Sequence, residues 1–117
     1  MEKIILLHNP RCSKSREALS YLKECKLEFK VREYLKDQLT ETEINDISKK
    51  LNLSPKEFIR KKEAVYKEHD LKNKNDNELI SAMEQFPILI ERPILIKGDK
   101  AAVGRPIENI KNLFECL

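Results

Sequence analysis

The first third of the chain moves from an apolar run to helical spacing and then to strict alternation. Residues 4–7 are all apolar and rich in isoleucine, which is typical of a strand buried on both faces, and a turn at Pro10 follows. Residues 14–25 place their apolar side chains on one helical face. Residues 27–32 alternate apolar and charged side chains, the period of a half-exposed strand. This order predicts two strands paired in parallel through a right-handed crossover.

The middle of the chain carries three signals for the start of a helix. They are Thr40 with Glu43, the segment Ser54-Pro55-Lys56-Glu57, and Asn75 with Glu78. In each, a short polar side chain is followed three residues later by Glu, the pattern of a capping box. These signals predict an inserted helical region over about residues 40–86. We expect the polar stretch at 72–76 to be a solvated loop inside that region.

The last third returns to short apolar runs. The runs, each expected to be extended, lie at residues 88–90, 94–96 and 101–103. The segment Lys97-Gly98-Asp99-Lys100 lies between the last two and predicts a hairpin turn. Apolar positions between residues 107 and 114 predict a short amphipathic helix. The whole order predicts an α/β fold in which helices cover the faces of a mixed sheet.

Length and composition narrow the class of protein. The 117 residues fit one domain, so we expect a single domain over residues 1–117. Lys and Arg number 23 against 20 Asp and Glu, and a net charge of +3 is too balanced to indicate nucleic-acid binding. The run at 4–7 is too short for a secretory signal, and no run approaches the ~20 residues of a membrane helix. We therefore expect a cytoplasmic protein that binds neither nucleic acid directly nor membranes.

Cys12 is the residue best placed for chemistry. It follows the first strand and a Pro turn and begins the first helix, where backbone N–H groups and the helix dipole favour a thiolate. Polar and cationic neighbours capable of adding to this effect are Asn9, Ser13, Lys14, Ser15 and Arg16. The residues alone are also compatible with a semi-buried cysteine in a turn.

The other two cysteines carry weaker signals. An odd number of widely spaced cysteines does not resemble a secreted disulfide framework, so we expect thiols in a reducing compartment. Cys25 falls on the apolar helix face and is expected to be a small core residue. Cys116, beside the C-terminus, is expected to be an incidental thiol, with a resolving thiol as the alternative. The His and Cys residues lack the spacing of zinc ligands, so we expect no metal site.

Three of the six arginines lie at the ends of apolar elements. Arg60 closes the second capped segment, Arg92 follows the run at 88–90, and Arg105 follows the run at 101–103. A guanidinium group binds a tetrahedral oxyanion through two parallel hydrogen bonds. Spacing alone nevertheless favours ordinary ion-pair arginines at these positions.

Four separated motifs resemble the glutaredoxin-dependent arsenate reductase family. They are the segment from His8 to Leu19 around Cys12, the segment Leu53 to Arg60, the segment Pro87 to Ile94, and Gly104-Arg105-Pro106. The four motifs occur in register with those of the family, and the match spans nearly the whole chain. The resemblance implies a thioredoxin-like core with a mixed four-stranded sheet, flanking helices and a helical insertion, in agreement with the element order above.

The resemblance also implies roles for particular residues. Cys12 is the implied catalytic nucleophile. The implied oxyanion ligands are Arg60, Arg92 and Arg105, and the implied supporting residues are His8, Asn9, Ser15 and Pro93. Thioredoxin-like folds place a cis-Pro opposite the reactive cysteine, so we expect a cis bond at Arg92-Pro93. The implied reaction converts arsenate, or a related oxyanion, to arsenite with glutathione as co-substrate and glutaredoxin as partner, and with no bound cofactor.

Three positions near Cys12 depart from the best-known arsenate reductases. Ser13, Lys14 and Glu17 resemble a sister branch that carries Cys-Ser-Lys-Ser at this site. Two alternatives therefore stay open. One is a monothiol, glutathione-linked oxidoreductase that does not act on arsenate. The other is an Spx-like regulator that binds RNA polymerase and has a vestigial thiol, although Ser15 stands where such regulators carry a second cysteine.

Overall fold

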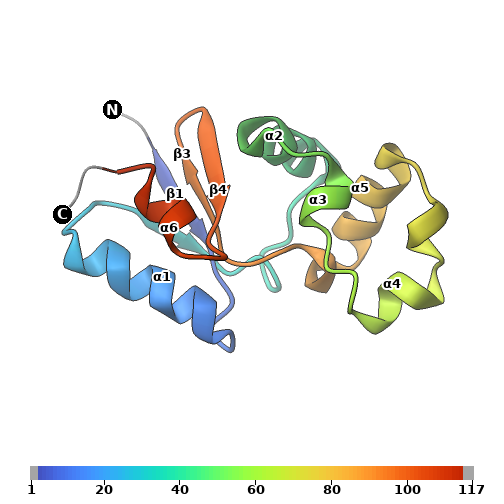
Figure 1. Ribbon diagram of the computed structural model, residues 1–117, viewed down its shortest axis with the longest axis horizontal. Helices are drawn as coiled ribbons and strands as arrows, with labels where there is room; N and C mark the ends of the chain where they lie inside the picture. Colours follow the sequence, from blue (N-terminus) through green and yellow to red (C-terminus); the bar gives the residue numbers. More distant parts are fainter. Residues whose placement is uncertain (1–2, 115–117) are drawn as a thin grey trace. The chain divides into compact units, whose positions relative to one another are not determined.

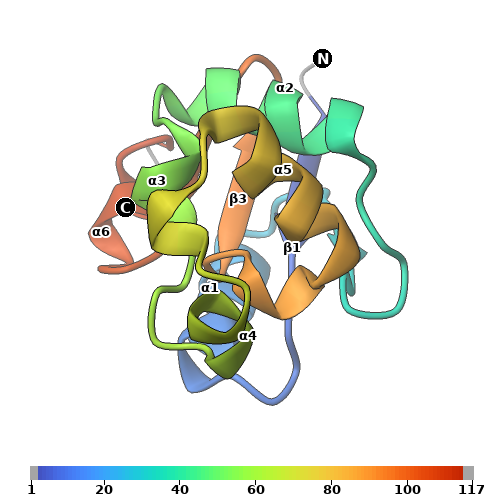
Figure 2. The same cartoon turned by 90° about the vertical axis from the view of Figure 1, so that its right-hand side faces the viewer.

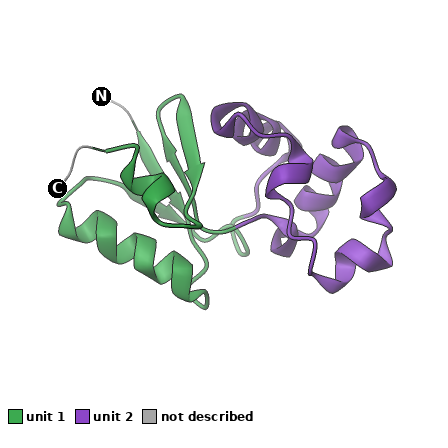
Figure 3. Ribbon diagram, in the orientation of Figure 1, with its two compact units in different colours: residues 1–37, 92–117 green, residues 38–91 purple. Residues whose placement is uncertain are grey.

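The computed structural model describes residues 3–114 and divides into two compact units (Figures 1 and 3). Unit 1 comprises Met1–Asp37 together with Arg92–Leu117, and unit 2 comprises Gln38–Glu91. The polypeptide thus leaves unit 1 once and returns to it. The helical region expected at about residues 40–86 falls within unit 2.

Unit 1 is built on a mixed four-stranded sheet. Its strands are β1 (Ile4–Leu7), β2 (Lys30–Arg32), β3 (Ile94–Lys97) and β4 (Lys100–Val103), in the order β2-β1-β3-β4. β1 pairs with β2 in parallel, as the sequence predicts, and β3 pairs antiparallel with both β1 and β4. The mixed sheet is therefore confirmed.

Two helices contribute to the core of unit 1. α1 (Ser13–Glu24) and α6 (Glu108–Lys111) lie beside the sheet (Figure 1). Their apolar side chains pack against those of β1 and β3. The residues of this cluster are fully buried and are Leu6, Ala18, Leu22, Leu95 and Ile110. Leu6 and Leu95 are register partners in the antiparallel β1–β3 ladder, so they present neighbouring side chains to the helices. This packing fixes the start of α1, and with it Cys12, relative to the sheet.

The expected hairpin is present between β3 and β4. Lys97 pairs with Lys100, which leaves Gly98 and Asp99 as the two turn residues. Gly98 has φ 59°, in the left-handed region that glycine enters without a steric cost. The turn therefore needs its glycine.

Unit 2 is helical and is organised around α5 (Asp76–Gln85), which packs against α2 (Glu41–Leu51) and α3 (Pro55–Phe58) (Figure 2). The remaining helical segments are α4 (Ala64–Glu68), the 3-10 turn η1 (Leu71–Asn73) and the 3-10 turn η2 (Pro87–Leu89). The most buried apolar side chains of the unit include Ile44, Phe58, Leu79, Met83 and Leu89. No helix within residues 3–114 is long and apolar enough to cross a membrane.

The three helix starts expected from the sequence are confirmed. Thr40 Oγ1 accepts a hydrogen bond from the Glu43 N–H, and the Glu43 carboxylate accepts one from the Thr40 N–H. Asn75 and Glu78 make the same reciprocal pair at the start of α5. At α3 the Glu57 carboxylate accepts from the Ser54 N–H at 2.7 Å. Each box satisfies N–H groups that a helix terminus would otherwise leave unpaired.

The segment 88–90 was expected to be a strand, and this prediction is wrong: most of it forms a 3-10 turn. Pro87 opens η2, in which Leu89 N–H bonds the Phe86 carbonyl and Ile90 N–H bonds the Pro87 carbonyl. A proline cannot donate a ladder hydrogen bond, and its fixed φ suits the first position of a helical turn. Ile90 alone makes a bridge, antiparallel to Ile59.

The second expected strand is shorter than its alternating pattern. Pairing covers residues 30–32, whereas the alternation covers residues 27–32. Lys26 adopts φ 57° and the Leu27 N–H reaches back to the Leu22 carbonyl, so this part of the chain closes α1 before it becomes a strand. Leu27 and Phe29 pack against the core cluster from this connection.

Candidate active site

Cys12 lies at the junction between the turn after β1 and the start of α1. It is the N-cap residue of α1, with extended backbone angles, and its own N–H bonds the Asn9 carbonyl at 3.0 Å. Its side chain is mostly buried, with 9% exposed. The thiol is free. The sulfur therefore sits beside the unpaired N–H groups of a helix start, as the sequence predicts.

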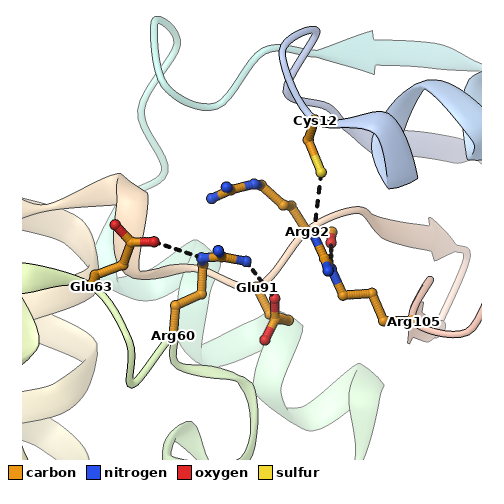
Figure 4. A network of polar contacts seen from close by, with 6 residues as sticks. All are labelled: Cys12, Arg60, Glu63, Glu91, Arg92 and Arg105. Carbon is orange, nitrogen blue, oxygen red and sulfur yellow. Dashed lines mark hydrogen bonds and ion pairs between the residues drawn. The ribbon is translucent and has the colours of Figure 1, made fainter.

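Arg105 lies directly beside the cysteine, as Figure 4 shows. Its Nη2 donates a hydrogen bond to the Cys12 Sγ at 3.2 Å, and its Nε donates to the Arg92 carbonyl at 2.6 Å. These two bonds hold one guanidinium plane against both the sulfur and the backbone that leads into β3. A cation fixed at this distance favours the thiolate over the thiol.

Arg92 provides hydrogen-bond donors without protein acceptors. Its Nε and Nη1 atoms are buried and have no hydrogen-bond partner within residues 3–114. Buried polar atoms are nearly always paired in folded proteins, and an unpaired donor is a reason to look for a bound acceptor. A tetrahedral oxyanion supplies several acceptor oxygens, and guanidinium groups match its geometry.

The environment lowers the pKa of Cys12 below that of an ordinary thiol. Burial alone would raise this pKa, because it penalises the charged form. The opposing influences are stronger together: the backbone N–H of Ser15, the Arg92 side chain, the backbone N–H of Lys14 and the charge of Arg105. Cys12 therefore carries more nucleophilic thiolate near neutrality than a free cysteine does.

His8, Asn9 and Ser15 form a buried network that shapes the loop carrying Cys12. His8 Nδ1 lies 2.6 Å from Ser15 Oγ, which also accepts a hydrogen bond from the Asn9 N–H at 3.0 Å. The Asn9 Oδ1 accepts from the Arg11 N–H. Burial lowers the pKa of His8, partly offset by Glu33, so the imidazole favours its neutral form. The network clamps the start of α1 to the end of β1.

This network shows which groups of the polar neighbours face the sulfur and which bond the loop instead. The sequence indicated Asn9, Ser13 and Ser15 as polar neighbours that could donate hydrogen bonds to the Cys12 sulfur. Within the described residues, the Ser15 hydroxyl and the Asn9 amide bond the loop instead, and the Ser13 side chain makes no hydrogen bond. The reason is that the side chain at position 15 turns inward, fully buried, while its backbone N–H faces the cysteine.

The Arg92-Pro93 peptide bond is cis, as predicted, and Arg105-Pro106 is a second cis bond that the sequence did not indicate. Gly104 joins these segments, because its N–H bonds the Pro93 carbonyl at 2.8 Å. A Cβ at position 104 would lie 2.6 Å from Ile110 Cδ1 and 2.8 Å from Pro93 Cγ. Gly104 is thus a supporting residue that the sequence reasoning missed, although a lone glycine directly before Arg105 was an available signal.

Arg60 belongs to unit 2, where two carboxylates hold it (Figure 4). Its Nε donates to Glu63 at 3.1 Å and its Nη1 donates to Glu91 at 2.9 Å. Burial alone would lower the pKa of Arg60, but the two glutamates raise it above its ordinary value. The structure thus brings Cys12, Arg92 and Arg105 together in unit 1 and fixes Arg60 inside unit 2.

Cys12 is the only free thiol within residues 3–114. Cys25 was expected to be a thiol and a small core residue, and both expectations are wrong: it is half-buried at the C-cap of α1 and is disulfide-bonded. The reason it leaves the core is that α1 ends at Glu24 and the chain turns at Lys26. Cys116 lies outside the described residues. Residues 3–114 hold no group of three or more His, Cys, Asp or Glu side chains arranged to bind a metal ion.

Comparison with known proteins places these features in a family. The ArsC family model matches residues 7–113. An arsenate reductase from Neisseria meningitidis is 47% identical over 114 residues, which is 95% of this chain and 97% of the relative. An arsenate reductase from Haemophilus influenzae is 40% identical over 95% of this chain and 98% of its own length.

Solved structures agree with the sequence comparison. An arsenate reductase from Vibrio cholerae superimposes with a TM-score of 0.92 at 34% identity, covering 97% of this chain and 98% of that one. Agreement over nearly the full length includes both the sheet of unit 1 and the helices of unit 2. The likeness confirms the thioredoxin-like α/β fold with its helical insertion.

Proposed function

This chain belongs to the ArsC family, and on that premise we propose that it is an arsenate reductase that uses the Cys12 thiolate as its nucleophile. Glutathione and glutaredoxin supply the reducing equivalents. We propose the substrate, the reductants and the roles of the individual residues together.

The observation that carries the proposal is the contact between Arg105 Nη2 and the Cys12 sulfur at 3.2 Å. One guanidinium next to the sulfur has two uses in such a reaction. It favours the thiolate before the reaction begins, and it neutralises charge on the oxyanion as the sulfur approaches. The unpaired buried donors of Arg92 add to the second use.

The proposed first step joins the sulfur to the oxyanion. The Cys12 thiolate attacks arsenic, one arsenate oxygen leaves as water, and a bond between Cys12 Sγ and arsenic(V) forms. Arg60, Arg92 and Arg105 bind the other oxygens in this proposal. Bidentate guanidinium contacts strengthen as negative charge gathers on those oxygens.

The proposed second step reduces the arsenic. The glutathione thiolate attacks Cys12 Sγ, the electron pair of the sulfur–arsenic bond passes to arsenic, and arsenite leaves as arsenic(III). The two sulfurs together lose two electrons and remain joined as a mixed disulfide. Glutaredoxin then takes over the glutathione by thiol–disulfide exchange, which returns Cys12 to its thiol form.

An external thiol is needed because Ser15 stands three residues beyond Cys12, where a dithiol site has its second cysteine. The Ser15 hydroxyl bonds His8 and the Asn9 N–H and has no redox chemistry of its own. Glutathione is kept reduced in the cytoplasm. We therefore assign the protein to that compartment as part of the same proposal.

A coupled assay tests this function directly. Purified protein is mixed with glutathione, glutaredoxin, glutathione reductase and NADPH, and NADPH oxidation is followed with and without arsenate. We expect arsenate-dependent oxidation that disappears in Cys12→Ser. Oxidation that depends on a glutathionylated protein but never on arsenate would overturn the proposal in favour of the monothiol oxidoreductase.

A further inference from the structure

Two backbone hydrogen bonds join the segment that carries Arg60 to the segment that carries Glu91. The Arg60 N–H bonds the Leu89 carbonyl at 2.7 Å, and the Glu91 N–H bonds the Phe58 carbonyl at 3.0 Å. They flank the antiparallel bridge between Ile59 and Ile90. In this antiparallel register Arg60 lies opposite Leu89 and Glu91 lies opposite Phe58, so the side chains of Arg60 and Glu91 leave the same face of the paired segments at diagonal positions. Their ion pair is therefore built into the fold of unit 2.

The guanidinium donors of Arg60 are divided between two carboxylates and one open position. Nε bonds Glu63 and Nη1 bonds Glu91, while Nη2 makes no hydrogen bond or ion pair within residues 3–114. The three side chains are each at least 74% buried. An oxyanion approaching the end of this guanidinium would use Nη2 and would meet the Glu91 carboxylate on the adjoining Nη1.

The local charge makes this an unusual place for an anion. One guanidinium faces two carboxylates, so the group as a whole is not cationic. A fully deprotonated dianion such as sulfate would be repelled by Glu91 and could offer it no proton. Arsenate and phosphate keep at least one O–H near neutral pH, and that O–H donates to a carboxylate.

We propose that Glu91 is a specificity-determining residue that accepts a hydrogen bond from a protonated tetrahedral oxyanion at Arg60 and disfavours sulfate. Glu63 holds the other side of the guanidinium and positions it. The inference rests on the proposed function, because it takes Arg60 as an oxyanion ligand. It adds that the site selects oxyanions by whether they carry a proton.

Calorimetric binding of arsenate, phosphate and sulfate at neutral pH tests the inference without requiring turnover. The variants are Glu91→Gln, which removes the charge, and Glu91→Asp, which keeps it. Glu91→Ala is a second charge-removing variant, so that the result does not depend on how one amide packs. Asp46→Asn is the matched control, since it removes one carboxylate of unit 2 that pairs with Lys50 on α2.

The wild-type protein should bind arsenate and phosphate more tightly than sulfate. In Glu91→Gln and Glu91→Ala, the preference for arsenate over sulfate should fall by about fivefold or more, the size expected for one nearby charge. Glu91→Asp and Asp46→Asn should keep the wild-type preference. Thermal melts followed by circular dichroism establish that each variant is folded.

An unchanged arsenate-to-sulfate preference in both charge-removing variants would overturn the inference. Arg60→Lys separates that result from a failure of the proposed function. If Arg60→Lys weakens arsenate binding while the Glu91 variants keep the preference, Arg60 is an oxyanion ligand and only the role of Glu91 is wrong. If Arg60→Lys binds arsenate as the wild type does, the oxyanion role of Arg60 itself is wrong.

Discussion

Arg105 Nη2 donates a hydrogen bond to the Cys12 Sγ at 3.2 Å, although the two residues lie 93 positions apart in the chain. The same guanidinium is anchored through Nε to the Arg92 carbonyl. The reactive sulfur is thus matched to a cation that comes from beyond the last strand of the sheet.

Cys12 should be the thiol that reacts fastest, and Arg105 should be part of the reason. Because the pKa of Cys12 is lowered, its alkylation by iodoacetamide should stay fast at a pH where ordinary thiols are protonated. Replacing Arg105 by Gln removes the nearby charge, so the midpoint of the rate–pH profile should move upward. We expect alkylation at pH 6 to slow by about three- to tenfold. Peptide mapping identifies the labelled residue, and preferential labelling of another cysteine would contradict this prediction.

Arg60→Lys should impair turnover more than it impairs folding. A lysine keeps the charge but cannot reproduce a guanidinium that bonds Glu63 and Glu91 and still offers Nη2. Loss of one charge-assisted hydrogen bond from the transition state predicts a fall in kcat/KM of about tenfold to hundredfold. Steady-state kinetics with arsenate gives the value. Full activity in Arg60→Lys would return this arginine to the role of a structural ion pair.

Gly104→Ala should lower the stability of the protein and disturb the position of Arg105 beside Cys12. The added methyl group would collide with Ile110 and Pro93, and overpacking of this kind costs about 1–3 kcal/mol of the free energy of unfolding. Because Arg105 follows directly, the Cys12 alkylation rate at low pH should fall as well. Gly98→Ala is the control, since it strains the hairpin at φ 59° without touching the site. That variant should lose stability and keep the alkylation rate, and equal rates in both variants would refute the prediction.

Acid should destabilise the protein through His8. Burial lowers the pKa of His8 in the folded state, so between the folded and unfolded pKa values the unfolded chain binds more protons. The free energy of unfolding should therefore decrease as the pH falls through about 6.5, the pKa of an unperturbed histidine. Urea unfolding at pH 7.5 and pH 5.5 measures the effect.

The second histidine supplies the comparison for that experiment. His69 stacks against Phe86 in unit 2 and is absent from the network at Ser15. His69→Gln should keep the acid-dependent loss of stability, whereas His8→Gln should reduce it. An equal pH dependence in the wild type and in His8→Gln would mean that other groups cause the loss.

Local sequence was enough to determine most of the elements and the position of Cys12 at the start of α1. The buried strand β1, the capping boxes at Thr40 and Asn75 and the hairpin at Gly98 each depend on a few adjacent residues. Cys12 at the start of α1 follows from the same local signals, because an apolar run, a Pro turn and helical spacing succeed one another. The cis bond at Pro93 was expected from the family resemblance and from no local signal.

Tertiary structure decided what surrounds Cys12. A long arginine side chain finds its acceptor among groups that packing brings near, so spacing could not show that Arg105 bonds the sulfur while Arg60 bonds Glu63 and Glu91. Packing likewise turned the Ser15 hydroxyl inward to His8, leaving its backbone N–H for Cys12.

Long-range packing also decided the features that local patterns did not predict, at residues 88–90 and at Gly104. An apolar run is compatible with a strand or a 3-10 turn, and at residues 88–90 the proline before it and the pairing of Ile90 with Ile59 decided between them. Gly104 is required only because Pro93 and Ile110 close in on it from other segments. Local chain propensity thus determined where the helices and most strands form, and long-range packing determined which charges and hydrogen bonds meet at Cys12 and at Arg60.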